Sequence, residues 1–83
     1  MITKFNEMTQ TGRDFVLYLL NQRLEFWTKN GHCTIEANEN EIEICCEKTM
    51  NGGVVEDAMK VADVWGFSSY IYCEMCQIRL KIY

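Results

Sequence analysis

The residues best suited to chemistry are the cysteines Cys73 and Cys76, which stand at the spacing of a two-thiolate metal ligand. Such a pair can bind zinc from a turn between strands. Zinc would need two further ligands, and the candidates are His32, Cys33, Cys45 and Cys46. Because these form no second spaced pair, reduced cysteines that only pack are the simpler interpretation. We therefore predict no cofactor, and name Cys73 and Cys76 as the ligands if zinc is bound.

Catalytic patterns are weaker still. His32 and Cys33 are adjacent, but neighbouring residues of a strand point to opposite faces, so they do not form a nucleophile and base. A redox role for Cys73 and Cys76 would favour the N-terminus of a helix, where the dipole lowers a thiol pKa, whereas this pair is expected between strands. Gly52-Gly53 is too short for a phosphate-binding loop. We predict that the protein is not an enzyme.

A row of acidic residues is more informative, and we call it the acidic ladder. It consists of Glu36, Glu41, Glu43 and Glu47. Alternate residues of a strand lie about 6.8 Å apart, so these carboxylates would form a regular negative row on one face of a sheet. Two interpretations stand: a solvated face that discourages aggregation, or a docking surface for lysine and arginine, including basic grooves that normally take nucleic acid.

The last strand pair carries a second set of candidate binding residues, the tyrosine hairpin. It consists of Tyr70, Tyr72 and Tyr83 with Arg79 and Lys81. Tyrosine and arginine are enriched at protein interfaces, but tyrosines paired across strands also stabilise sheets, and both interpretations stay open. Exposed aromatics can stack RNA bases, a role that the neighbouring acidic ladder disfavours.

Composition narrows the class of protein. The chain has 83 residues, a net charge of −4 and five cysteines. It is predicted to form one domain, residues 1–83, that does not bind nucleic acid directly, since phosphate contacts need a basic face. An odd number of cysteines without a signal peptide predicts free thiols, and no apolar run is long enough to span a membrane. We expect a cytoplasmic protein.

Hydrophobic periodicity predicts the elements. Apolar residues at helical spacing predict a first helix over about 13–28, preceded by a capping box at Thr11–Asp14 and ended by Asn30-Gly31. Its apolar face is broad, with Phe15 among the core residues, so a second helix or a partner chain should cover part of it. A second helix follows the breaker Asn51–Gly53 and ends at Gly66, which suits a left-handed cap.

The remaining segments alternate with a period of two, which predicts strands over 32–37, 41–47 and a hairpin over 69–83. The residues 38–40 are a turn whose types tolerate left-handed geometry. The order α-β-β-α-β-β predicts an α+β two-layer sandwich, a four-stranded antiparallel sheet with two helices on one face. The order of the strands within the sheet is left open.

The segment 58–71, with the pattern Ala-Met-x-x-Ala-x-x-Trp-Gly followed by a tyrosine-bearing strand, resembles part of a small type I-F anti-CRISPR protein of bacteriophages. The resemblance implies an inhibitor encoded by a phage or mobile element. Such a protein would act in the bacterial host cell and block a CRISPR effector complex by occluding a basic nucleic-acid-binding surface or a subunit-docking surface. It implies no functional residues, because the matched positions are structural.

Two alternatives from other classes are kept. One is a small structural module stabilised by zinc at Cys73 and Cys76. The other is a homo-oligomeric accessory or regulatory protein that uses the broad apolar face of the first helix.

Overall fold

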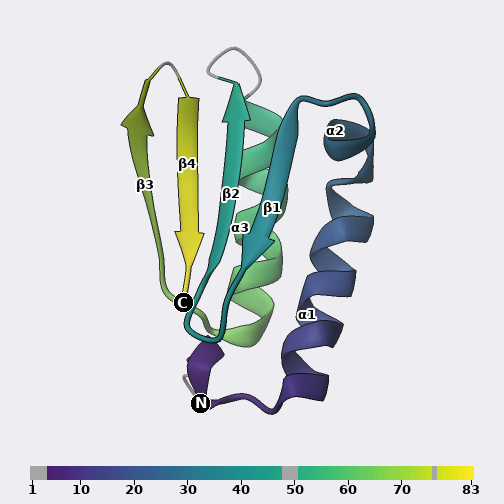
Figure 1. Cartoon of the computed structure of the whole chain (residues 1–83), viewed down its shortest axis with the longest axis vertical. Coiled ribbons are helices and arrows are strands. Elements are labelled where there is room, and N and C mark those ends of the chain that lie inside the picture. Colours follow the sequence, from purple (N-terminus) through teal and green to yellow (C-terminus); the bar gives the residue numbers. More distant parts are fainter. Residues whose placement is uncertain (1–3, 48–50, 76) are drawn as a thin grey trace.

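Four strands pair into one antiparallel sheet in the order β1-β2-β4-β3 (Figure 1). The computed structural model describes residues 4–47, 51–75 and 77–83. The strands are β1 (Cys33–Ala37), β2 (Ile42–Glu47), β3 (Ser69–Glu74) and β4 (Gln77–Ile82), and the helical segments are η1 (Phe5–Glu7), α1 (Gln10–Arg23), α2 (Glu25–Lys29) and α3 (Asn51–Trp65). The predicted α+β fold with a four-stranded antiparallel sheet is confirmed.

The core lies between one face of the sheet and the helices. The central strands place Ile42 opposite Ile82 and Ile44 opposite Leu80, and all four side chains are at most 1% exposed. Burying each such side chain contributes about 1.5–3 kcal/mol. The helices cover them with Val16, Leu20, Leu24, Val54, Ala58 and Ala62. The period of two in the sequence thus identified the buried face of both central strands.

The first helix begins earlier than predicted. Its N-cap is Thr9, whose hydroxyl accepts a hydrogen bond from the backbone N–H of Gly12 at 3.1 Å. The predicted capping box at Thr11–Asp14 is therefore wrong, since those residues are already helical. The reason is the preceding turn η1: it buries Phe5 completely against Phe67, with ring centroids 6.0 Å apart, and fixes where the helix can start.

The predicted single helix is divided at Leu24, after which α2 runs to Lys29. Gly31 ends α2 in the left-handed conformation (φ 75°), as predicted. Only part of the predicted apolar face is buried, because Phe15, which was expected to belong to that face, is half exposed. Tyr18 and Phe26 are exposed too.

Helix α3 also starts earlier than predicted, since Asn51–Gly53 belongs to its first turn rather than preceding it. Glycine is needed there for a packing reason. A Cβ on Gly53 would lie 2.6 Å from Cζ2 of Trp27, so the indole ring occupies the space that a side chain would fill. At the other end Gly66 adopts φ 74° and the N–H of Phe67 donates to the Ala62 carbonyl at 3.0 Å, the predicted C-terminal cap.

The two hairpin loops use different devices. Residues 38–40 form the predicted turn, and although their types tolerate left-handed geometry, none of them adopts it. Instead Oδ1 of Asn38 accepts hydrogen bonds from the N–H groups of Asn40 and Glu41, at 2.7 and 3.0 Å. The second loop joins Glu74 to Gln77, and Met75 takes the left-handed conformation (φ 47°) that favours glycine. None of the helices in the described part of the chain is long and apolar enough to cross a membrane.

Replacing Met75 by glycine should stabilise the protein. The left-handed conformation costs a non-glycine residue about 1–2 kcal/mol, and glycine removes this cost. The greater chain entropy of glycine offsets part of the gain, so we expect a stabilisation of about 1 kcal/mol. Met75 is 86% exposed and loses little packing. The measurement is urea unfolding of Met75→Gly beside Met75→Ala, which keeps the strained conformation. Equal stability of the two variants would contradict this account.

Candidate functional site

The face of the sheet that points away from the helices carries every candidate binding residue of the sequence. One row of paired residues crosses all four strands, from Glu36 through Glu43 and Lys81 to Tyr70. Because side chains alternate along a strand, the acidic ladder and the tyrosine hairpin share this surface. We call it the open face, and its candidate residues are Glu36, Glu41, Glu43, Glu47, Tyr70, Tyr72, Arg79, Lys81 and Tyr83.

Glu43 is the centre of a polar cluster on the open face. Oε2 accepts a hydrogen bond from the Tyr72 hydroxyl at 2.9 Å, and Oε1 accepts one from Nη1 of Arg79 at 3.0 Å. Nζ of Lys81 lies 3.9 Å from Oε2. The hydrogen bond from Tyr72, with those cations, holds the pKa of Glu43 below its ordinary value despite the opposing effect of desolvation.

The cluster continues to both sides of Glu43. Nζ of Lys81 lies 3.3 Å from Glu41, and this hydrogen-bonded pair raises the pKa of Lys81. Nε of Arg79 lies 3.6 Å from a carboxylate oxygen of Glu74. The sequence interpretation did not include Glu74 in the surface, although Glu74 follows Tyr72 by two residues and therefore lies on the same side of the strand. Two members of the acidic ladder are thus bound to cations of the tyrosine hairpin.

The remaining carboxylates leave the open face negative. The described residues of this face include two cations, Arg79 and Lys81, and five carboxylates, which are Glu36, Glu41, Glu43, Glu47 and Glu74. Glu36 is exposed and forms no ion pair within the described ranges, and Glu47 lies only at 4.0 Å from Nδ1 of His32. Negative charge without a cation therefore collects along β1 and the end of β2.

The other half of the open face is aromatic. The rings of Tyr70 and Tyr72 stack with centroids 5.8 Å apart, and Tyr83 meets Tyr70 edge to face at 5.9 Å. Tyr70 and Tyr83 remain 46% and 42% exposed. Nζ of Lys81 lies 5.9 Å from the Tyr72 ring centroid, at the boundary between the two halves. The aromatic residues and the exposed carboxylates thus lie at opposite sides of the open face, and the paired cations Arg79 and Lys81 lie between them.

The cysteines are distributed over both faces. Cys33 and Cys46 are buried against the helices, Cys45 lies on the open face, and Cys73 is exposed on the edge strand β3. Cys76 lies outside the described residues, so the predicted pair with Cys73 cannot be placed. Within the described ranges, no group of three or more metal-ligating side chains comes together.

Burial also makes the cysteine thiols poor nucleophiles. Desolvation raises the pKa of Cys33 to about 11 and raises that of Cys46 as well. Both thiols are therefore protonated at neutral pH, and the thiolate is the form that attacks or binds metal. His32 lies beside Glu47 at the strand end, whereas Cys33 faces the helices, so the two side chains lie on opposite sides of the sheet.

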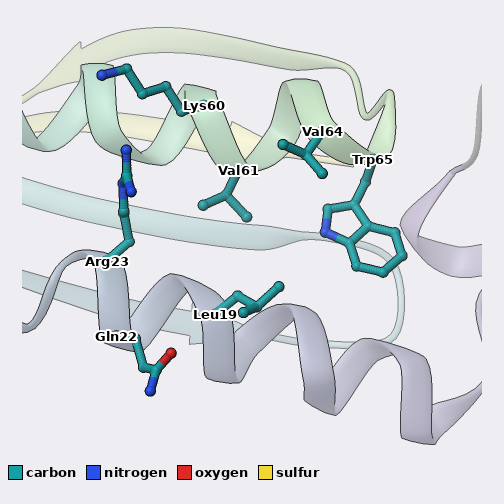
Figure 2. A pocket seen from close by; sticks show the side chains of 7 residues that line it. All are labelled: Leu19, Gln22, Arg23, Lys60, Val61, Val64 and Trp65. Carbon is teal, nitrogen blue, oxygen red and sulfur yellow. The ribbon is translucent and has the colours of Figure 1, made fainter.

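A groove between α1 and α3 is a separate feature on the helix side (Figure 2). Leu19, Val61, Val64 and Trp65 form its apolar wall, and Val64 is 81% exposed. Arg23 and Lys60 stand at one end of it, where each has an acidic neighbour on α3, Asp57 at 3.8 Å and Glu56 at 3.6 Å. The groove therefore offers apolar area without free charge.

Stability should depend on pH through Glu43. A carboxyl group whose pKa is lowered by folding adds stability that is fully present above its ordinary value of 4.5 and is lost as the pH falls through the folded value. We expect the free energy of unfolding to decrease as the pH falls below 4.5. Glu43→Gln should lower the free energy of unfolding at pH 7 and should make it decrease less on acidification. The measurement is urea unfolding at pH 7 and at a pH below 4.5.

Glu36→Gln is the matched control for this experiment, because Glu36 lies opposite Glu43 on the same face and forms no ion pair within the described ranges. It should retain the steep pH dependence. A Glu43→Gln variant that loses stability on acidification as steeply as the unmodified protein would show that another carboxylate is responsible.

Comparison of the chain with protein-family models gives no match, and no curated protein matches it.

Proposed function

We propose that this protein is a non-enzymatic binding protein that attaches to a basic surface of a partner protein through its open face. The observation that carries the proposal is that one face presents an exposed tyrosine cluster at one side and the exposed carboxylates of Glu36 and Glu47 at the other, with the Glu43 cluster between them. Tyrosine supplies large contact area at low entropic cost and is enriched among residues that dominate binding energy. The carboxylates would pair with lysine and arginine of the partner and orient it.

The two halves would have different tasks. Tyr70 and Tyr83 present exposed rings, on which a partner's arginine or an apolar side chain can pack. Glu36 and Glu47 lie on the opposite half of the face and are exposed. Glu43 and Arg79 already satisfy each other at 3.0 Å, so their role would be to hold the face rigid before binding.

The narrower form of this proposal names the partner. Following the resemblance of residues 58–71, the protein would be a phage or mobile-element inhibitor that occludes a basic surface of a CRISPR effector complex in the bacterial cytoplasm. The acidic half of the open face supports an occupant of a site that otherwise takes nucleic acid, because such sites are lined with lysine and arginine.

Binding should be tested by affinity purification from bacterial lysate that contains a type I-F CRISPR effector complex, with the tagged protein as bait. Stoichiometric recovery of an effector subunit is the expected result. Recovery of none, with folded bait, would contradict the narrower form, and the partner would then be sought among the proteins that are retained.

Charge reversal on the acidic half should weaken binding at least tenfold, or about 1.4 kcal/mol. The variant is Glu36→Lys with Glu47→Lys, which leaves the Glu43 cluster intact. Exchanging Glu43 itself would place a third cation beside Arg79 and Lys81 and disturb the fold. Titration by surface plasmon resonance at two salt concentrations is the measurement, since charge-driven association weakens as salt is added.

The matched control carries the same change of net charge away from the open face, Glu7→Lys with Glu25→Lys, both at exposed positions. It should bind like the unmodified protein. Equal weakening by the two double variants would point to net charge alone, and no weakening by either would exclude the acidic half as the contact surface.

A further inference from the structure

The edge strand β3 has backbone groups that are free to pair with another strand. Ser68 and Tyr83 exchange both of their backbone hydrogen bonds, at 3.1 and 2.9 Å. Such pairs alternate with non-bonded ones along an antiparallel ladder, so Tyr70, Tyr72 and Glu74 direct their backbone groups toward β4. The N–H and C=O groups of Ser69, Ile71 and Cys73 therefore point outward from the sheet.

This edge lacks the devices that normally prevent strand pairing. Those devices are proline, lysine, a bulge, or a covering helix. The sequence of β3 has neither proline nor lysine, and its register with β4 is continuous over all six residues. Figure 1 shows β3 at the outer side of the sheet, with α3 behind β1 and β2. Ile71 is 48% exposed as a result.

The other edge of the sheet is less suited to a second copy of this acidic chain. Strand β1 carries Glu36, and exposed Glu39 follows it in the loop, so two copies joined there would bring like charges together. Residues 69–73 on β3 include no aspartate, glutamate, lysine, arginine or histidine, and the cations Arg79 and Lys81 lie on the adjacent strand. Electrostatics thus leaves β3 as the edge that tolerates another copy.

We propose that two copies of this protein pair through β3 in an antiparallel, two-fold arrangement centred on Ile71, which extends the sheet to eight strands. This register is the one that uses all the outward groups. Ser69 lies opposite Cys73 of the second copy and Ile71 opposite its own equivalent, with about six backbone hydrogen bonds. The terminal Glu74 then meets Ser68 of the second copy rather than another acid.

Side chains on both faces support this register. On the helix side, Ile71 lines an apolar groove with Val55, Met59 and Ile78, and the second Ile71 would cover its open side. On the open face, Tyr70 of one copy lies beside Tyr72 of the other. The stacked tyrosines of each copy therefore join into one aromatic cluster. Pairing across the edge would bury side chains that the single chain leaves half exposed.

The register is tested by cysteine crosslinking. In Ser69→Cys the new thiol should lie opposite Cys73 of the second copy, with Cα atoms about 5.5 Å apart, within the range that a disulfide spans. Within one chain the two positions are four residues apart, ~13 Å along the strand, so no internal bond competes. Oxidation with diamide should produce a covalent dimer on non-reducing gels at least tenfold faster than in the control Ser68→Cys.

Two further variants make the result specific. Adding Cys73→Ser to Ser69→Cys removes the facing thiol and should abolish the rapid crosslink. Ile71→Lys should be more monomeric than the unmodified protein in sedimentation equilibrium at concentrations up to about a millimolar. Its circular dichroism spectrum should be unchanged. Dimerisation should strengthen with salt, because screening reduces repulsion between two chains of net charge −4.

The inference is overturned if Ser69→Cys crosslinks no faster than Ser68→Cys and the unmodified protein sediments as a monomer at the highest concentration. A dimer that persists in Ile71→Lys would also overturn it and would place the contact elsewhere, for example on the helix layer. Neither result bears on the open-face proposal, whose readout is partner capture and not self-association.

Discussion

The pairing of β2 with β4 is the constraint on which the rest of the structure depends. These central strands are separated by α3 and β3 in the chain, so their pairing is non-local. Their register places Ile44 against Leu80 under the helices. The same register forces Glu43 against Lys81 on the opposite face, because the side chains of a strand alternate. A slip by one residue would expose the core and bury the carboxylates, so the hydrophobic core fixes the geometry of the open face.

The polar cluster shows how a core constraint becomes a surface property. Glu43 accepts hydrogen bonds from Arg79 of the neighbouring strand β4 and from Tyr72 of β3, the strand beyond it. It is largely shielded, with 20% of its side chain exposed, and its pKa is lowered. Such a carboxylate can accept few further hydrogen bonds from a partner. The neighbouring carboxylate of Glu36 forms no ion pair within the described ranges and remains available. An acidic row that is uniform in sequence is therefore divided into a structural part and an available part.

The sequence patterns predicted the helices and strands and their buried faces better than the bounds of these elements or the order of the strands in the sheet. The alternation of apolar and polar residues identified both faces of β2 and β4, because each of these strands has one buried side and one side that faces solvent. Helix starts were missed because they depend on tertiary contacts, the burial of Phe5 for α1 and the approach of Trp27 to Gly53 for α3. The polar cluster was missed because strand order was open. The sequence did contain a signal for this pairing. The acids Glu41 and Glu43 are two residues apart, and so are the bases Arg79 and Lys81, which carry the opposite charge.

The order of the strands also decides what each edge of the sheet can do. Because β4 inserts between β2 and β3, the acids of β1 and β2 lie at one side and the uncharged residues 69–73 at the other. The two sides are separated by the paired cations of β4. In the two proposals, a basic partner meets the acidic half through carboxylates, and a second copy meets the neutral edge through backbone groups, with Tyr70 near both contacts. Both proposals thus depend on the same strand order.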